Sequence, residues 1–125
     1  MTLLLLCIAG GVGALARFVA DGLIRTRLGR SFPWGTLIIN ISGSLLLGVI
    51  TGLVLYRHAA PATKLMLGTG FCGGYTTFST ASFETVRLIE EKRFRRALFN
   101  SCGTLILTIL GGALGLLLAY WMRGV

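Results

Sequence analysis

The chain has 125 residues, of which 54% are hydrophobic and only 13% charged, and its mean hydropathy is +0.83. These values exclude an ordinary soluble protein, and the length allows a single domain over residues 1–125. The net charge of +8 comes from arginines and lysines beside apolar segments. That placement is typical of topology signals and contacts with anionic lipid headgroups, so we expect no nucleic-acid partner.

Four runs of the sequence carry no charged residue: 2–16, 35–56, 65–83 and 97–122. A helix needs about 20 apolar residues to cross a bilayer. The sequence therefore predicts an all-α membrane protein with four transmembrane helices, at about residues 2–24, 35–56, 65–89 and 97–122. The first run lacks a basic stretch before it, so we expect a retained span and not a removable signal peptide.

The first predicted span has a small-residue face at Gly10, Gly13 and Ala14, which suits close helix contact. Arg17 and Asp21 are four residues apart, so they share a face and are expected to pair. One interpretation is a headgroup-level salt bridge that fixes the helix end. The other places Arg17 at the mouth of an anion pathway.

The second predicted span carries Asn40, Ser44, Gly48 and Gly52 at four-residue steps. Gly48 and Gly52 form a GxxxG pair, which indicates helix packing. A buried asparagine needs partners for two donors and an acceptor. Asn40 therefore either links two helices or faces a ligand.

The third predicted span is irregular, because residues 68–83 contain four glycines and seven hydroxyl side chains. We expect the helix to break at Gly73 and Gly74. Irregular backbone at membrane depth is tolerated only where it faces protein or a watery cavity. This stretch is therefore interpreted as a permeation or binding element, and its freed carbonyls would suit a cation such as sodium.

The fourth predicted span repeats the polar pattern of the second, with Asn100, Thr104 and Thr108 on one face. Threonines in such helices often bond to their own backbone carbonyls. The alternative is a polar track shared with the second span.

The chemistry available to these spans is neutral. The cysteines show no paired spacing and the one histidine, His58, lies in a loop, so we expect neither a side-chain metal site nor an enzyme. No acidic residue is predicted at mid-membrane, which counts against a small proton-coupled multidrug transporter. Hydroxyls, a carboxamide, freed N–H groups and the ring edge of Phe78 would suit a small, strongly hydrated anion.

The loop charges predict an orientation. If four spans are present, three basic residues lie on the side of the termini and eight on the other side. The positive-inside rule then places loops one and three in the cytoplasm and both termini outside. The eight basic residues are Arg25, Arg27, Arg30, Arg87, Lys92, Arg93, Arg95 and Arg96.

Three stretches closely resemble the Fluc (CrcB-type) fluoride channels: GGVGALARF at 10–18, GTLIINISGSLLLG at 35–48 and GFCGGYTTFST at 70–80. The resemblance covers nearly the whole chain, and its GG-TTFST string is highly specific. It implies four helices per subunit, two subunits packed antiparallel and two fluoride pores. It also implies a central sodium ion held by main-chain carbonyls of the third-helix breaks.

The resemblance further implies roles for individual residues. Gly73 and Thr76 match the sodium-coordinating positions, and Arg17 and Glu84 match positions near the pore mouths. The positions that match the pore lining are Asn40, Phe78, Ser79, Thr80, Thr104 and Thr108.

One position departs from the family pattern. The family usually reads TTFSTF, with a second pore phenylalanine, but this chain has Ala81 there. Phe83 lies five residues after Phe78, on a different helical face. The phenylalanine pair is incomplete, which puts conduction through both pores in question.

The resemblance implies a passive fluoride exporter in the plasma (inner) membrane of a prokaryote, which reduces fluoride toxicity. The resemblance implies one of two assemblies, a dual-topology homodimer or a paralogous heterodimer. The charge bias together with Ala81 favours the heterodimer. The alternatives are a small proton-coupled multidrug transporter and a non-conducting structural partner subunit of a heterodimeric channel.

Overall fold

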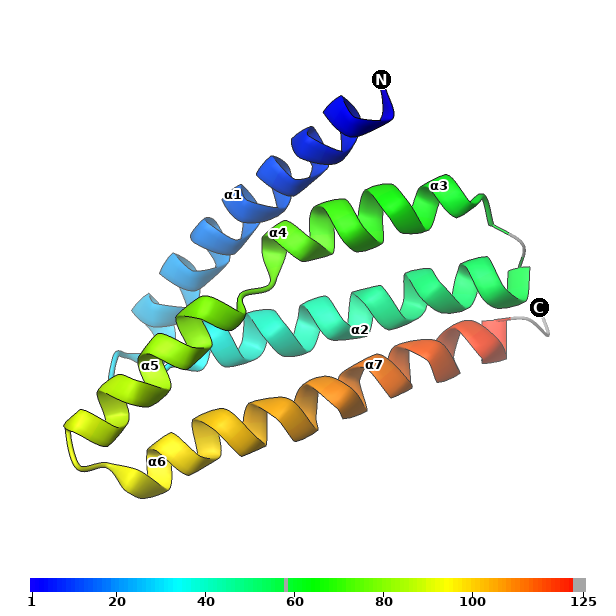
Figure 1. The fold of residues 1–125 in the computed structure, drawn as a ribbon. Coiled ribbons are helices and arrows are strands. Elements are labelled where there is room, and N and C mark those ends of the chain that lie inside the picture. Colours follow the sequence, from blue (N-terminus) through cyan, green and yellow to red (C-terminus); the bar gives the residue numbers. More distant parts are fainter. Residues whose placement is uncertain (58, 123–125) are drawn as a thin grey trace.

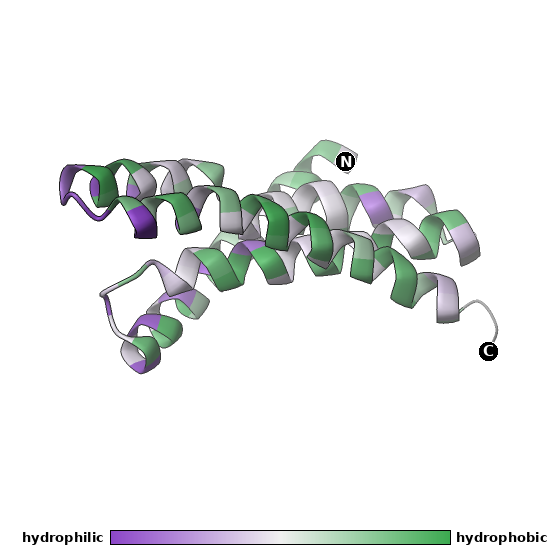
Figure 2. Cartoon of the chain, turned by 90° about the horizontal axis from the view of Figure 1, so that it is seen from below, coloured by the Kyte–Doolittle hydropathy of each residue, from purple (hydrophilic) through white to green (hydrophobic). Residues whose placement is uncertain are grey.

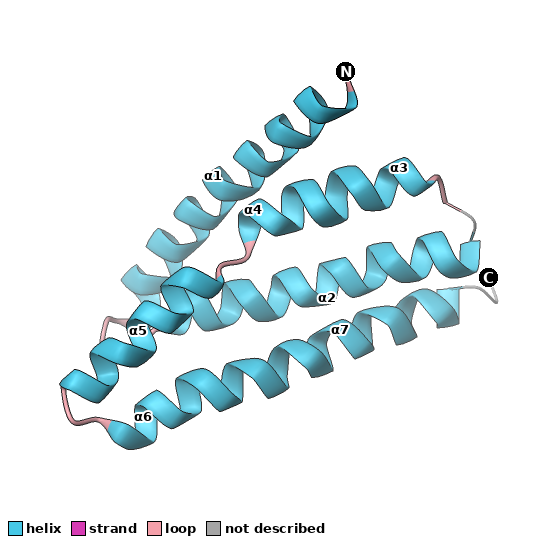
Figure 3. Cartoon of the chain, in the orientation of Figure 1, coloured by secondary structure: helices cyan, strands magenta, loops and turns pink. Residues whose placement is uncertain are grey.

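The computed structural model describes residues 1–57 and 59–122, so the loop histidine His58 and the Arg123 charge counted at the C-terminus lie outside the described residues. Within these residues the chain is helical apart from short links (Figure 3). The elements are α1 (Thr2–Leu28), α2 (Trp34–Arg57), α3 (Pro61–Thr63), the π-helical stretch η1 (Lys64–Cys72), α4 (Gly73–Tyr75), α5 (Phe78–Glu90), α6 (Phe94–Leu98), the π-helical stretch η2 (Phe99–Gly103) and α7 (Thr104–Trp121).

These elements make four crossings (Figure 1). The helix formed by α3, η1 and α4 meets α5 at a break, and together they form the third crossing; α6, η2 and α7 form the fourth. Three helices are long and apolar enough to span a membrane: Thr2–Leu28, Trp34–Tyr56 and Phe94–Trp121. The third crossing is split into two shorter helices, so no single helix in it has the length of a span. The all-α, four-crossing architecture is therefore confirmed.

The helices run further than the uncharged runs do. α1 continues past residue 24 to Leu28 and ends at Gly29, whose φ of 77° lies in the left-handed region that glycine adopts readily. The third crossing begins at Pro61 and the fourth at Phe94, three or four residues before the predicted starts. Hydropathy marks only the part of a helix inside the hydrocarbon, and helical hydrogen bonding continues into the interface.

α2 and α7 pack closely through glycines. A Cβ at Gly48 would collide with the backbone carbonyl of Gly112, and one at Gly115 would collide with the carbonyl of Leu45. Gly52 lies against the side chain of Ala119. The packing role predicted for the GxxxG pair is thus confirmed.

α1 contacts the first half of the third crossing in the same way. A Cβ at Gly13 would collide with the carbonyl of Phe71, and one at Gly74 would collide with the carbonyl of Gly10. The small-residue face predicted for the first span is therefore in contact with the backbone just before the break.

The surface is apolar along the crossings and polar at one end. Hydrophilic colour gathers at the end that carries the loops after α1 and α5 (Figure 2), and the N and C labels mark the opposite end (Figure 1). Large side chains such as Leu15 and Leu117 are exposed on the single chain, which suits contact with lipid. The protein is a multi-pass membrane protein.

Gly48→Ala is expected to destabilise the protein, because the new methyl group would meet the Gly112 carbonyl and force α2 and α7 apart. Overpacking of this kind costs about 1–3 kcal/mol. The midpoint of thermal unfolding in detergent, followed by circular dichroism, measures it. Gly112→Ala is the matched control, since its Cβ would lie 3.7 Å from the Ser44 carbonyl at ordinary contact distance. Equal midpoints for the two variants would contradict this account.

Candidate functional site

The break lies at Thr76 and Thr77, where the backbone is extended with φ,ψ of −81°,160° and −148°,118°. The predicted break at Gly73 and Gly74 is wrong, because both residues are helical and Gly73 has φ,ψ of −62°,−39°. Gly74 is a glycine because α1 approaches it, not because the chain turns there. The physical cause of the break lies at Thr77, whose backbone bonds to a side chain of α2.

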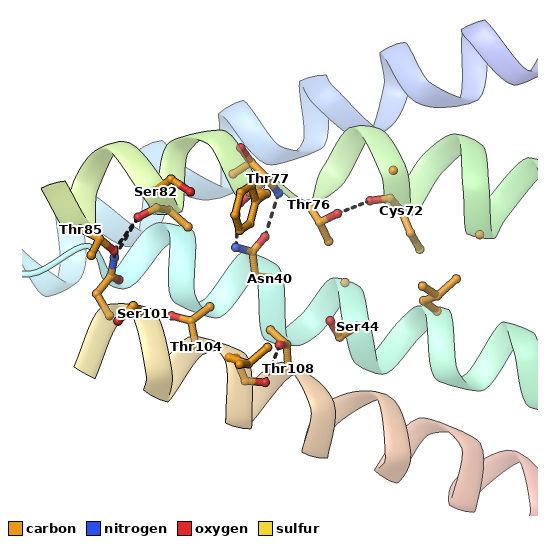
Figure 4. A pocket seen from close by; sticks show the side chains of 18 of the residues that line it. Asn40, Ser44, Cys72, Thr76, Thr77, Ser82, Thr85, Ser101, Thr104 and Thr108 are labelled. Atoms are coloured by element: carbon orange, nitrogen blue, oxygen red, sulfur yellow. Dashed lines mark hydrogen bonds between the residues drawn. The ribbon is translucent and has the colours of Figure 1, made fainter. Parts of the chain in front are cut away.

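Asn40 of α2 stabilises the break through hydrogen bonds to the backbone of Thr77. Its Nδ2 donates to the Thr77 carbonyl at 2.9 Å, and the Thr77 N–H donates to its Oδ1 at 2.8 Å (Figure 4). In an unbroken helix that N–H would donate to the carbonyl of Gly73. Asn40 is 8% exposed, and its carboxamide replaces the helical partner of the Thr77 N–H and adds a donor to the Thr77 carbonyl, which as N-cap of α5 also accepts the first bond of that helix. Of the two roles left open for Asn40, the structure shows the link between helices.

Threonines cap both ends of the break. The Thr76 hydroxyl donates to the Cys72 carbonyl at 2.9 Å. The Thr77 hydroxyl accepts from the N–H of Thr80 at 3.2 Å, as an N-cap of α5, and donates to the Thr80 hydroxyl at 3.0 Å. The carbonyl of Gly73 thus loses its helical donor while the chain on each side stays hydrogen-bonded.

A cavity of about 690 Å³ opens beside the break, between α2, the third crossing and the fourth crossing (Figure 4). Most of its polar lining consists of neutral hydroxyl and amide groups. The lining comprises Asn40, Gly43, Ser44, Leu47, Gly68, Cys72, Gly73, Thr76, Thr77, Phe78, Ala81, Ser82, Thr85, Val86, Asn100, Ser101, Thr104, Leu105 and Thr108.

The structure brings four of the six predicted pore residues to this cavity: Asn40, Phe78, Thr104 and Thr108. The two predicted sodium residues, Gly73 and Thr76, line it too. Ser79 and Thr80 are outside this lining, and Thr80 instead takes part in the cap of α5.

Aromatic side chains differ in their relation to the cavity. Phe78 is 87% exposed and forms part of the wall. Ala81 also lines the cavity, whereas Phe83, 69% exposed, is outside the lining. The difference in helical face predicted for Phe83 is therefore observed, and the alanine falls on the cavity wall.

The polar stripe of the fourth crossing has mixed roles. Asn100 is 1% exposed and donates from Nδ2 to the Thr85 hydroxyl at 2.8 Å and to the Ala81 carbonyl at 3.2 Å. Thr108 bonds back to the Leu105 carbonyl at 2.9 Å. The Thr104 hydroxyl is buried and has no hydrogen-bond partner among the described residues.

Five hydroxyl residues in the cavity were given no individual role by the sequence analysis: Ser44, Thr77, Ser82, Thr85 and Ser101. Ser44 already stood on the polar stripe of the second span. Thr85 follows Ala81 by one helical turn, which is the signal that could have placed it on the same face.

Arg17 and Asp21 do not form the expected ion pair. Arg17 Nη1 donates to the Thr76 carbonyl at the break, at 3.5 Å, and Asp21 pairs with Arg25 Nε at 2.8 Å. The prediction was wrong because residues four positions away in both directions compete for Asp21. Glu84 lies 3.5 Å from Arg25 Nη2 and lines a second cavity at the loop end.

Acidic side chains are absent from the lining of the first cavity. In the described part of the chain, no group of histidines, cysteines and carboxylates could hold a metal ion. Cys72 is buried, whereas Cys7 and Cys102 are exposed on the single chain. Any cation at this site would depend on carbonyl oxygens.

Comparison with known proteins places this geometry in context. Residues 4–121 match the family described as CrcB-like protein, Camphor Resistance (CrcB). "Fluoride-specific ion channel FluC 1" of Leifsonia xyli is 47% identical over 99% of this chain and 88% of its own. "Fluoride-specific ion channel FluC 2" of Cutibacterium acnes is 48% identical over 94% and 97%. "Fluoride-specific ion channel FluC" of Pyrococcus furiosus is 44% identical over 92% and 93%.

Asn40→Leu is expected to destabilise the protein, since it leaves the Thr77 N–H unpaired, at about 1–3 kcal/mol, and removes one of the hydrogen bonds to the Thr77 carbonyl. Thermal unfolding in detergent measures the loss. Ser44→Ala is the control, because Ser44 lines the same cavity one turn further along α2 and makes no hydrogen bond to a described side chain. An Asn40→Leu protein as stable as Ser44→Ala would show that the break does not depend on the carboxamide.

Proposed function

The chain belongs to the CrcB family, and we propose that it forms a fluoride-selective channel that lets cytoplasmic fluoride leave the cell down its electrochemical gradient. Its relatives over nearly the whole chain carry the name fluoride-specific ion channel. The observation that carries the proposal is the first cavity, where neutral hydrogen-bond donors gather beside a break in a membrane-spanning segment. No catalytic step is part of this function.

The cavity chemistry suits an anion that must exchange water for other donors. Hydroxyls of Thr104 and Ser82 can donate to fluoride, and the positive ring edge of Phe78 can approach it. Conduction requires sites that replace hydration without holding the ion permanently, and neutral donors meet that requirement. The Thr104 hydroxyl, which is buried without a partner in the described chain, is the best placed of these donors.

Sodium is proposed as a structural ion at the break. The carbonyl of Gly73 lacks its helical donor, and a Cβ at Gly73 would meet no heavy atom within 4 Å beyond its own stretch of helix. This open, oxygen-bearing position fits a cation that takes only oxygen ligands. The carbonyl of Thr76, which accepts only a long 3.5 Å hydrogen bond from Arg17, is the second candidate ligand.

An antiparallel dimer is proposed for the channel. The cavity and the exposed ring of Phe78 form an open face on the single subunit, and a second subunit there would enclose the pathway. The predicted orientation places the arginine-rich loops in the cytoplasm of a prokaryote and the termini outside the plasma (inner) membrane. One subunit of such a dimer must insert the other way round.

The dimer is either a homodimer or a heterodimer with a paralogue. A strong charge bias resists insertion in both orientations, and Ala81 removes one aromatic ring from a cavity wall. Both observations favour a heterodimer whose second subunit has the opposite bias. In that arrangement this chain also has the structural role of a partner.

The proton-coupled multidrug transporter is less well supported than the channel. Such a transporter needs an ionisable relay within the membrane. The four acidic residues of this chain are Asp21, Glu84, Glu90 and Glu91, and none lines the first cavity.

Purified protein in liposomes is expected to release fluoride and to leave chloride inside, because the cavity offers hydrogen bonds matched to a small, strongly hydrated anion. A fluoride electrode measures the efflux, and chloride is the comparison ion. If only the heterodimer conducts, efflux requires the paralogous subunit as well. Absence of fluoride efflux with and without that subunit would contradict the proposed function.

Phe78→Ile is expected to reduce fluoride efflux about tenfold, which corresponds to about 1.4 kcal/mol, because the aliphatic side chain has no positive ring edge. Phe83→Ile is the matched control, since Phe83 is also exposed in α5 but is outside the cavity lining. The readout is efflux from liposomes loaded with equal amounts of protein. Equal efflux from both variants would remove Phe78 from the pathway.

A further inference from the structure

A second cavity, also of about 690 Å³, lies at the loop end of the subunit, where α1, the loop before α2 and the end of α5 meet. Its charged lining consists of four arginines and two glutamates, namely Arg25, Arg30, Arg87, Arg93, Glu84 and Glu91. The excess of positive charge makes this end favourable for an approaching anion. The electrostatic potential at this end depends on how the nearby carboxylates are paired.

Arg25 joins two carboxylates that come from different crossings. Its Nε lies 2.8 Å from Oδ2 of Asp21 on the same helix, and its Nη2 lies 3.5 Å from Oε1 of Glu84 on α5. The side chain of Arg25 is 44% exposed, against 28% for Asp21 and 14% for Glu84. The guanidinium therefore stands between the two carboxylates and water.

No other cation in the described chain forms an ion pair with either carboxylate. Oδ1 of Asp21 and Oε2 of Glu84 are both buried without a hydrogen-bond partner there. Two of the neighbouring arginines pair with another carboxylate, since Arg87 lies 3.1 Å and Arg93 3.2 Å from Glu91. Removal of Arg25 would leave Asp21 and Glu84 without an ion-pair partner in the described chain, Glu84 keeping a side-chain hydrogen bond with Thr36 and the nearby charge of Arg87.

We propose that Arg25 is a positioning residue of the channel, which neutralises Asp21 and Glu84 and so keeps the loop end of the pathway open to anions. The inference rests on the proposed function and adds the charge control of one mouth to it. With Arg25 the lining presents four arginines against two glutamates to fluoride, whereas without Arg25 it presents three against two, and Asp21 and Glu84 lose their ion-pair partner.

The test compares fluoride efflux from liposomes for matched variants. Arg25→Gln is expected to lower the efflux rate about tenfold, a loss in the range of electrostatic effects on association. Adding Asp21→Asn to Arg25→Gln removes one of the two negative charges that lost their ion-pair partner and should restore at least half of the lost rate. Arg25→Lys keeps the charge and should stay close to wild type.

Arg27→Gln is the matched control, because Arg27 is an exposed arginine two positions further along α1, with no ion pair in the described chain and outside the second cavity. It should leave efflux unchanged. Elution volume and thermal midpoint, measured on every variant, separate a folding defect from a charge effect. Raised concentrations of an inert salt should also shrink the Arg25→Gln defect, which a purely structural role would not do.

Wild-type efflux in Arg25→Gln, or an equal loss in Arg27→Gln, would overturn the inference and leave the proposed function intact. If Arg25→Gln fails to assemble, Asp21→Asn alone decides: efflux at or above the wild-type rate supports the inference, and reduced efflux by a well-assembled protein overturns it. Failure of the wild-type protein to release fluoride would instead contradict the proposed function itself.

Discussion

The backbone of the third crossing can leave the helical conformation inside a membrane because Asn40 accepts from the Thr77 N–H, which loses its helical acceptor, and also donates to the Thr77 carbonyl. Lipid offers no replacement partner, so each unpaired backbone group there costs several kcal/mol. The pairing resembles that of two adjacent peptides in a sheet, although one partner is a side chain. The cavity, the freed carbonyl of Gly73 and the start of α5 all depend on this contact.

Glycines decide how near the other helices come to that contact. α2 can place Asn40 beside the break because Gly43 leaves room for the Thr76 side chain, and Gly48 lets α2 and α7 approach backbone to backbone. α1 reaches the same region through Gly10 and Gly13. In lipid, where apolar burial gives little drive to helix association, close packing of this kind is what holds helices together.

Charge and hydrogen-bonding capacity are separated along the molecule. The first cavity is lined by neutral donors, whereas arginines and carboxylates gather at the loop end, where water and lipid headgroups can solvate them. Arg17 is the exception, because its guanidinium reaches the Thr76 carbonyl at the break. The proposed pathway would therefore lead an anion from the positively charged lining at the loop end to the uncharged donors of the first cavity.

The sequence by itself determined the number of crossings, the GxxxG contact of Gly48 and Gly52, and the polar stripes that meet at the cavity. Each of these follows from composition or from the 3.6-residue period of a single helix. Only the tertiary structure decided that the chain breaks at Thr76 and Thr77 and that Asn40 is the hydrogen-bond partner of Thr77. It also decided that Asp21 forms its ion pair with Arg25 and not with Arg17. These depend on the axial register between helices, because Gly74 lies against α1 within a continuous helix, and an asparagine at the matching axial position of α2 can replace a helical bond. The periodicity of one helix gives no information about the axial position of its residues relative to a neighbouring helix.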